Sequence, residues 1–249
     1  MPITFNYNNV DPSWRACLQS ALDTMDPHYL KNLYCNNEWL PGPEKIFNAF
    51  SLPVEKVNYV LFGESPYPRK QSANGYAFWD EAVQDIWSES GLSKSVNRAT
   101  SLRNIIKMLL IAEDALLPSN TTQTDIVQVN KNNFVQTNQE FFHNLLQHGF
   151  LLLNASLVLQ PTSVRKDAKA WRPFLKAVLQ FLIQNNPNIK FVLLGNIALE
   201  MEPLIYDSKL VRIYAEHPYN ISFINNPIIL NFFKPLHLLK KSGCHISSI

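Results

Sequence analysis

Three segments of the chain carry side chains that can do chemistry, and each begins where a run of apolar residues ends. Glu64 follows one run, Asn154 ends another, and His217 follows a third. A carboxylate can orient water, an amide can both donate and accept hydrogen bonds, and a histidine can stabilise a developing charge. With a fourth, shorter segment, the candidate loops are Gly63-Glu64-Ser65-Pro66-Tyr67-Pro68, Asn154-Ala155-Ser156, Gly195-Asn196 and Glu216-His217-Pro218-Tyr219-Asn220-Ile221-Ser222.

The apolar runs before these loops predict buried β-strands. They lie at 57–62, 150–153, 191–194 and 210–215, and they are short and rich in β-branched or aromatic residues. Helical patterns at 101–117 and 170–184 separate the first three runs, which predicts βαβ units and a helix-covered parallel sheet. Because ligands of such sheets bind outside the carboxyl ends of the strands, we expect the four loops to converge on one rim.

The rest of the chain predicts few further elements. Residues 14–25 have apolar side chains at helical spacing, and residues 44–50 after Gly42-Pro43 predict another short helix. The polar segment 118–139 predicts a long surface excursion.

Composition bounds the kind of protein. The chain has 249 residues, 46% of them hydrophobic, and a formal net charge of +2, which together exclude overall disorder and confine any nucleic-acid site to a local patch. We expect one domain over residues 1–249, with its core at about 12–240. Three distant cysteines argue against disulfides and a four-cysteine metal site. We see no signal peptide or membrane-spanning run, and expect an intracellular, cytoplasmic protein.

Six motifs, in order, resemble those of the family 1 uracil-DNA glycosylases. The family's Gly-Gln-Asp-Pro-Tyr-His signature is similar to Gly63–Pro68 here, and its His-Pro-Ser-Pro-Leu-Ser segment is similar to His217–Ser222. The other four are Ile46-Phe47-Asn48-Ala49-Phe50, Asn74-Gly75-Tyr76-Ala77-Phe78, Ser101-Leu102-Arg103-Asn104-Ile105 and Gly149-Phe150-Leu151-Leu152-Leu153-Asn154. The resemblance covers roughly residues 12–240 and implies a three-layer α/β/α sandwich around a short four-stranded parallel sheet.

The first motif departs from the family where its water-positioning Asp should be. Ser65 stands there, and Pro68 replaces the final His. Glu64 stands where the similarly folded family 4 enzymes have Glu, but those enzymes hold an iron–sulfur cluster for which this chain lacks the cysteines. Glu64 either orients the water, with Ser65 as a hydrogen-bonding partner, or is a solvent-facing loop carboxylate.

The resemblance implies a role for each remaining site residue. Asn154 would read the uracil edge, Phe78 would stack on the flipped base, and Tyr67 would exclude the methyl group of thymine. His217 would hydrogen-bond the departing uracil, and Ile221 would fill the emptied base stack. Contacts to DNA phosphates would come from Ser72, Ser101, Ser222, Arg165 and Lys166. Arg165 and Lys166 could instead simply be solvent-exposed charges at the start of a helix.

The leading hypothesis is therefore a monomeric DNA repair hydrolase that flips uracil out of single- or double-stranded DNA and cleaves its N-glycosidic bond without metal or cofactor. The main alternative is a catalytically impaired glycosylase-like module that binds DNA or a protein partner, as the loss of the Asp at Ser65 would suggest. A third hypothesis is an enzyme that acts on another base.

Overall fold

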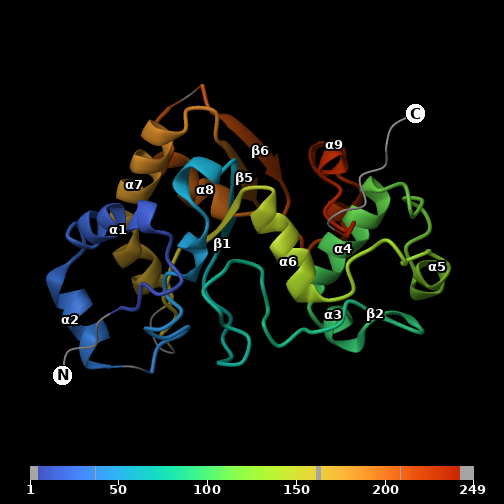
Figure 1. The fold of residues 1–249 in the computed structure, drawn as a ribbon, viewed down its shortest axis with the longest axis horizontal. Coiled ribbons are helices and arrows are strands. Elements are labelled where there is room, and N and C mark those ends of the chain that lie inside the picture. Colours follow the sequence, from blue (N-terminus) through green and yellow to red (C-terminus); the bar gives the residue numbers. More distant parts are fainter. Residues whose placement is uncertain (1–4, 37, 161–163, 208, 242–249) are drawn as a thin grey trace. The chain divides into compact units, whose positions relative to one another are not determined.

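The computed structural model describes residues 5–36, 38–160, 164–207 and 209–241 (Figure 1). The chain divides into two compact units. The first unit contains Met1–Asp80 and Gly149–Arg212, and the second contains Glu81–His148 and Ile213–Ile249. The expectation of a single domain over residues 1–249 stays a prediction.

The first unit contains three of the four predicted strands and the helices near them in sequence. Its elements, with 3₁₀ helices labelled η, are η1 (Pro12–Trp14), α1 (Arg15–Leu22), α2 (Pro27–Cys35), η2 (Asn48–Ser51), η3 (Val54–Lys56), β1 (Tyr59–Gly63), β4 (Phe150–Asn154), α7 (Val164–Asn185), β5 (Lys190–Leu194), α8 (Ile197–Met201) and η4 (Glu202–Leu204). Strand β6 (Val211–Ala215) begins in this unit and ends in the second.

The second unit is mostly helical. Its elements are β2 (Trp87–Ser88), β3 (Gly91–Leu92), α3 (Lys94–Arg98), α4 (Thr100–Ala112), α5 (Gln123–Val127), α6 (Asn138–Gln147), η5 (Ile221–Asn225), α9 (Pro227–Phe233) and η6 (Lys234–Leu236).

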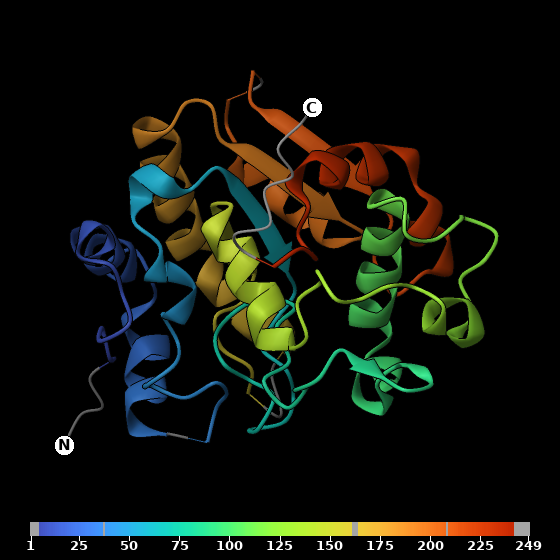
Figure 2. The ribbon, with the colours of Figure 1, turned by 45° about the vertical axis from the view of Figure 1, so that its right-hand side comes forward.

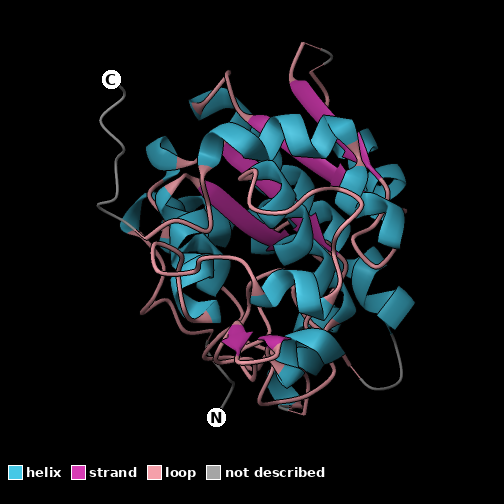
Figure 3. Ribbon diagram, turned by 90° about the vertical axis from the view of Figure 1, so that its right-hand side faces the viewer, coloured by secondary structure: helices cyan, strands magenta, loops and turns pink. Residues whose placement is uncertain are grey.

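The main sheet has the strand order β4-β1-β5-β6, and β1 pairs in parallel with both β4 and β5. Figure 3 shows the strands in magenta among the helices in cyan. All four predicted strands are confirmed, with their ends moved by no more than two residues. Leu61, Leu152 and Val192 are buried with their neighbours along each strand, so β1, β4 and β5 are covered on both faces. The prediction that the run at 210–215 is a buried strand is wrong as to burial, because β6 lies at the edge of the sheet and Val211 and Tyr214 are 51% and 40% exposed. The predicted α/β class, with a parallel sheet flanked by helices, is therefore confirmed.

The core of the first unit lies between the sheet and helices α1 and α7. These two helices lie side by side (Figures 1 and 2). Phe62 and Phe191 stack with ring centroids 6.3 Å apart, and they join one hydrophobic cluster with Trp14, Trp171 and Phe174. Burial of each large aromatic side chain is worth about 1.5–3 kcal/mol, so this cluster stabilises the frame on which the strand ends are mounted.

The predicted helix at 44–50 is wrong in type. Residues 43–47 form turns, and only η2 follows, with Phe47 and Phe50 at non-helical dihedral angles. Both phenyl rings are buried and pack against Phe174. Tertiary packing of the two rings therefore overrides the local helical pattern.

The predicted surface excursion at 118–139 is wrong in part. It contains α5, whose start is fixed by a capping box between Thr122 and Asp125, and it buries Ile126. Val135 is also buried, and its N–H donates to the carbonyl oxygen of Leu239 at 2.8 Å. Four residues of this segment, Ile126, Phe134, Val135 and Asn138, are buried, and the rest lies at or near the surface as predicted.

The other predicted helices are confirmed with shifted ends. The segment predicted at 14–25 forms α1 after η1, where Asp11 caps the first turn through the N–H of Ser13. The segment predicted at 101–117 ends earlier, in α4, and the one predicted at 170–184 begins earlier, in α7. In the part of the chain that the structure describes, no helix is long and apolar enough to cross a membrane.

Cys17 and Cys35 are free thiols in the structure, and Cys244 lies outside the described residues. Burial raises the pKa of Cys17 to about 12, so this thiol stays protonated and unreactive at neutral pH.

Gly149 sets the register between β1 and β4, because its carbonyl oxygen accepts from the N–H groups of both Asn58 and Tyr59. Its φ is +85°, and an added Cβ would lie 2.5 Å from the carbonyl oxygen of Lys56 and 2.5 Å from the Asn58 amide nitrogen. We expect Gly149→Ala to lower the free energy of unfolding by about 1–3 kcal/mol more than Gly42→Ala does.

Gly42 is the matched control, since its φ is +91° but no atom lies within 4 Å of the added Cβ. Urea unfolding of both variants measures the difference. Equal losses would show that backbone strain alone, and not the close approach, makes glycine necessary at position 149.

Candidate active site

The carboxyl ends of β1 and β4 bring the first candidate loop against the second. Gly63 pairs with Asn154 in the sheet register. The pairing continues beyond both strands, because the N–H of Ala155 donates to the Gly63 carbonyl oxygen at 2.8 Å and the N–H of Ser156 donates to the Glu64 carbonyl oxygen at 3.0 Å. The backbone of Glu64 is therefore fixed next to the residues that follow Asn154.

Asn154 is the polar centre of this arrangement. It is only 3% exposed, and its Oδ1 would lie 2.5 Å from a Cβ placed on Gly63. Its carboxamide is not among the fully buried polar side-chain groups that lack a hydrogen-bond partner. The amide carries both a donor and an acceptor at the strand end where ligands of parallel sheets bind.

The loop that carries Phe78 is fixed to the same strand end. The N–H of Ala77 donates to the carbonyl oxygen of Leu152 at 3.0 Å, and Asn48 holds the loop through the carbonyl oxygen of Asn74 at 2.9 Å. Phe78 itself has a φ of +63°, a left-handed conformation that costs a non-glycine residue about 1–2 kcal/mol. The Phe78 side chain is half-buried.

Tyr67 joins the first loop to this one. Its hydroxyl donates to the Phe78 carbonyl oxygen at 3.1 Å. Burial raises the pKa of Tyr67, and the nearby Asp80 carboxylate raises it further, so the phenol is neutral at all physiological pH values. Asp80 is itself buried and paired with Arg69 at 3.0 Å, which anchors the far end of the loop.

Glu64 and Ser65 occupy the start of the first loop. Glu64 is exposed and Ser65 is half-buried, while Pro66 between Ser65 and Tyr67 is buried. The Glu64 side chain is therefore accessible to water. A role in orienting a water molecule stays a prediction.

The predicted phosphate-contact residues of the first unit differ in accessibility. Ser72 is fully buried, and its hydroxyl has no hydrogen-bond partner among the described residues, so a phosphate contact from it requires the loop to move. Arg165 and Lys166 are both exposed in the first turn of α7. The next residue, Asp167, is buried and accepts hydrogen bonds from Tyr29 and Gln160.

In the second unit, His217 begins a tightly organised turn. Its Nδ1 lies 3.1 Å from the backbone N–H of Tyr219, which can only donate. Nδ1 is therefore the acceptor, and neutral His217 carries its proton on Nε2. A second bond, from the N–H of Asn220 to the His217 carbonyl oxygen at 2.9 Å, closes the turn.

The remainder of this segment presents an apolar residue to solvent. Ile221 is 61% exposed, as an apolar wedge requires, and Ser222 beside it is exposed as well. Burial raises the pKa of Glu216, but hydrogen bonds from its own backbone, Ser222 and Asn226 outweigh this and lower the pKa overall. Glu216 is therefore ionised, and it ties Ser222 and Asn226 to the base of the segment.

Helix α4 supplies the last predicted residue and one that sequence reasoning missed. Ser101 is half-buried in its first turn. Asn104, one turn later, is buried and donates to the Pro218 carbonyl oxygen at 2.7 Å. The motif at 101–105 contained Asn104, but nothing local in the sequence indicated a partner at residue 218.

Each unit thus brings together its own set of predicted residues. The first gathers Glu64, Ser65, Tyr67, Phe78 and Asn154, and the second gathers His217, Ile221, Ser222 and Ser101 on two adjoining segments. The expectation that all of them share one rim stays a prediction. Among the described residues, no three His, Cys, Asp or Glu side chains are grouped as a metal site would need.

The fold and sequence are shared along nearly the whole chain with a solved structure. The wild-type UNG of Nitratifractor salsuginis is 38% identical, with a TM-score of 0.89 and 94% of both chains covered. The chain belongs to the uracil-DNA glycosylase superfamily. No family model matches it.

Other relatives agree with this assignment. The protein named uracil-DNA glycosylase from Amoebophilus asiaticus is 28% identical over 220 residues, which is 84% of each chain, and that of Pseudomonas entomophila is 27% identical over 221 residues, 86% of this chain and 82% of its own. The mimivirus uracil-DNA glycosylase, 18% identical with a TM-score of 0.58 over 84% of this chain and 70% of its own, shares the fold.

Gly63 lets the carboxamide of Asn154 lie across the end of β1. An added Cβ would also lie 2.8 Å from the Ala77 Cβ, so we expect Gly63→Ala to lower the free energy of unfolding by about 1–3 kcal/mol. Combining Gly63→Ala with Ala77→Gly removes the contact with the Ala77 Cβ and keeps the contact with the Asn154 Oδ1.

Urea unfolding of the two single variants and the double variant measures this. If Gly63→Ala alone is as stable as the unchanged protein, the close approach of Asn154 to β1 is not a constraint on this position.

Proposed function

We propose that this protein is a DNA repair glycosylase of the family 1 branch that hydrolyses the N-glycosidic bond of uracil in DNA, with a divergent water-positioning motif. One observation carries the proposal: Asn154, only 3% exposed, ends β4 and brings its carboxamide close to Gly63 at the end of β1, where ligands of parallel sheets bind. Names and structures of the relatives support uracil in DNA as the substrate.

Asn154 reads the uracil base in this proposal. Its Nδ2 is a donor and its Oδ1 an acceptor, which matches the carbonyl and N–H on the Watson–Crick edge of uracil. A site built from such buried groups discriminates strongly, because a wrong base leaves them unpaired.

Phe78 and Tyr67 form the rest of the base pocket. The ring of Phe78 stacks on the extruded base, and the Tyr67 hydroxyl holds the backbone of Phe78 through its carbonyl oxygen. The neutral Tyr67 ring excludes the C5 methyl group of thymine, a steric distinction worth about 1–3 kcal/mol.

His217 stabilises the uracil anion as the bond to the sugar breaks. The proton on Nε2 makes this neutral imidazole a hydrogen-bond donor, and a donor fixed before the reaction costs no reorganisation when charge develops. The bond between the sugar and the base breaks, the electron pair leaves with uracil, and water adds to the sugar.

Glu64 is the group that we assign to the water and to the sugar cation, with Ser65 as its hydrogen-bonding neighbour. Its exposure in the unliganded protein is compatible with a carboxylate that meets the DNA only on binding. The same exposure is what the binding-module hypothesis predicts, so Glu64 is the residue at which the two hypotheses separate.

In this proposal, DNA is bound through contacts to its phosphates and through an apolar side chain that enters the base stack. Exposed Ile221 enters the stack that the base leaves, and Ser101, Ser222, Arg165 and Lys166 contact the backbone. Ser72 joins them only after its loop opens. We propose that the protein acts as a monomer and without a metal or cofactor.

Release of uracil from oligonucleotides tests the function. With uracil-containing single- and double-stranded DNA we expect alkali-labile abasic product, and none from matched thymine-containing DNA. Asn154→Asp replaces the donor by an acceptor, and we expect it to lower the rate at least about 100-fold. No abasic product at enzyme-stoichiometric levels would overturn the proposal.

The water-positioning group is tested by two substitutions. We expect Glu64→Gln to lower the rate about 10²–10⁴-fold, and Ser65→Asp to raise it, because it restores a carboxylate at the family position. Ser65→Asn is the control of equal size without charge. Salt-sensitive DNA binding without base release, unchanged by Glu64→Gln, would instead support the binding module.

A further inference from the structure

The inference concerns Asn104, which lies on α4 and is only 1% exposed. Its Nδ2 donates to the carbonyl oxygen of Pro218 at 2.7 Å and lies 3.4 Å from that of Tyr219. Its Oδ1 faces the side chain of Arg103, whose Nε is 3.5 Å away. A donor on that side fixes the orientation of the amide, so the NH₂ group faces the carbonyl oxygens.

The carbonyl that Asn104 binds belongs to the same peptide group as the N–H that binds His217. The Pro218 C=O and the Tyr219 N–H are the two ends of one planar unit, and because it is trans, they point in opposite directions. Asn104 therefore holds one end of the plane while the other end donates to Nδ1 of His217. Rotation of this plane would break both hydrogen bonds together.

A chain of two hydrogen bonds through one peptide group is also cooperative. A donor at the carbonyl oxygen polarises the peptide and strengthens donation by its N–H. The buried Pro218 adds rigidity, because its ring fixes φ just before the plane. Through this peptide, α4 contributes to the direction of the imidazole ring and to the position of its proton.

We propose that Asn104 is a positioning residue that sets the orientation and the Nε2-protonated tautomer of His217 through the Pro218–Tyr219 peptide. This rests on the proposed function, in which His217 stabilises the uracil anion. Asn104 touches neither base nor sugar in this proposal and acts only through His217.

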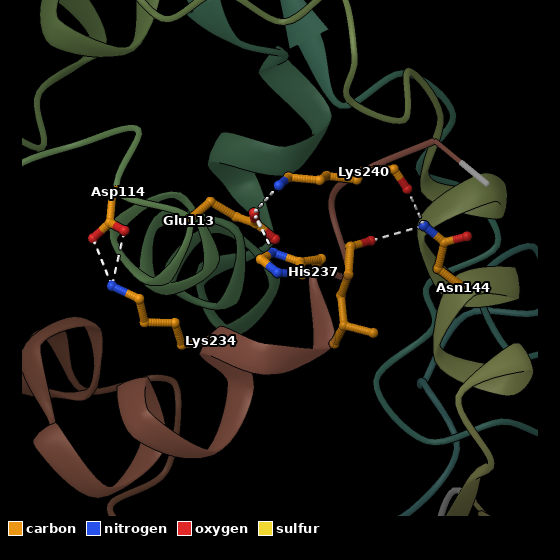
Figure 4. A network of polar contacts seen from close by, with 7 residues as sticks. Glu113, Asp114, Asn144, Lys234, His237 and Lys240 are labelled. Atoms are coloured by element: carbon orange, nitrogen blue, oxygen red, sulfur yellow. Dashed lines mark hydrogen bonds and ion pairs between the residues drawn. The ribbon is translucent and has the colours of Figure 1, made fainter. Parts of the chain in front are cut away.

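The second unit contains a matched control. Asn144 on α6 is 5% exposed, and its Nδ2 donates to the carbonyl oxygens of Leu238 and Lys240 at 2.9 and 2.7 Å (Figure 4). It is thus another buried amide that ties a helix to the C-terminal part of the chain. The segment that it holds carries none of the proposed site residues.

The experiment replaces each Asn by Leu, which is similar in size and has no donor. We measure single-turnover uracil release at saturating enzyme, at a temperature where both variants are folded. We expect Asn104→Leu to slow release roughly 10- to 100-fold, as misplacement of a reacting group does. Asn144→Leu should lose comparable stability and keep the original rate.

A double-mutant cycle with His217→Ala separates positioning from general damage. In the His217→Ala protein, Asn104→Leu should change the rate less than about twofold, because the residue through which it acts is gone. Asn104→Asp, the same size but unable to donate, should behave like Asn104→Leu. Additive effects in the cycle, or equal slowing by Asn144→Leu, would overturn the inference.

The tautomer itself gives a readout that does not need activity. Nitrogen-15 spectra of the imidazole should show His217 with its proton on Nε2 in the unchanged protein, and a mixture of tautomers in Asn104→Leu. An unchanged tautomer in that variant would refute the role of Asn104. If the unchanged protein releases no uracil from any DNA, the proposed function fails, and the spectra still decide the inference.

Discussion

The close approach of the Asn154 carboxamide to the α-carbon of Gly63 is the constraint on which the first unit's site depends. It requires parallel pairing of β1 and β4 in one register, a glycine at the end of β1, and a small residue, Ala77, on the neighbouring loop. Because side chains alternate along a strand, a shift by one residue would turn the amide to the other face of the sheet. The position of the Asn154 carboxamide is thus fixed by the pairing of β1 with β4.

The parts of the fold with a strong local signal were predictable. The four strands are short apolar runs bounded by polar residues, and the amide of Asn154 stands at a strand end where ligands of parallel sheets bind. Helix α5 also has a local signal, the Thr122–Asp125 capping box, which the polarity of the surrounding segment obscured. By contrast, η2 replaces a predicted helix because Phe47 and Phe50 pack against residues more than 100 positions away.

The parts of the site that escaped prediction depend on contacts between distant residues. Asn104 and Pro218 are 114 residues apart, and no periodicity or spacing links them. The burial of Ser72 is likewise set by the folded loop and not by its neighbours in sequence. Candidate residues can therefore be named from the sequence, whereas their contacts with distant residues come only from the structure.

Phe78 has a strained backbone conformation. Its left-handed conformation would suit glycine or asparagine better, and either would relax the loop. Glycine and asparagine have no large flat ring. At position 78, a relaxed backbone and an aromatic ring that could cover a flat heterocycle therefore exclude each other. A stability-based redesign of the protein would replace Phe78 early, and would thereby remove the aromatic ring that we propose stacks on the base.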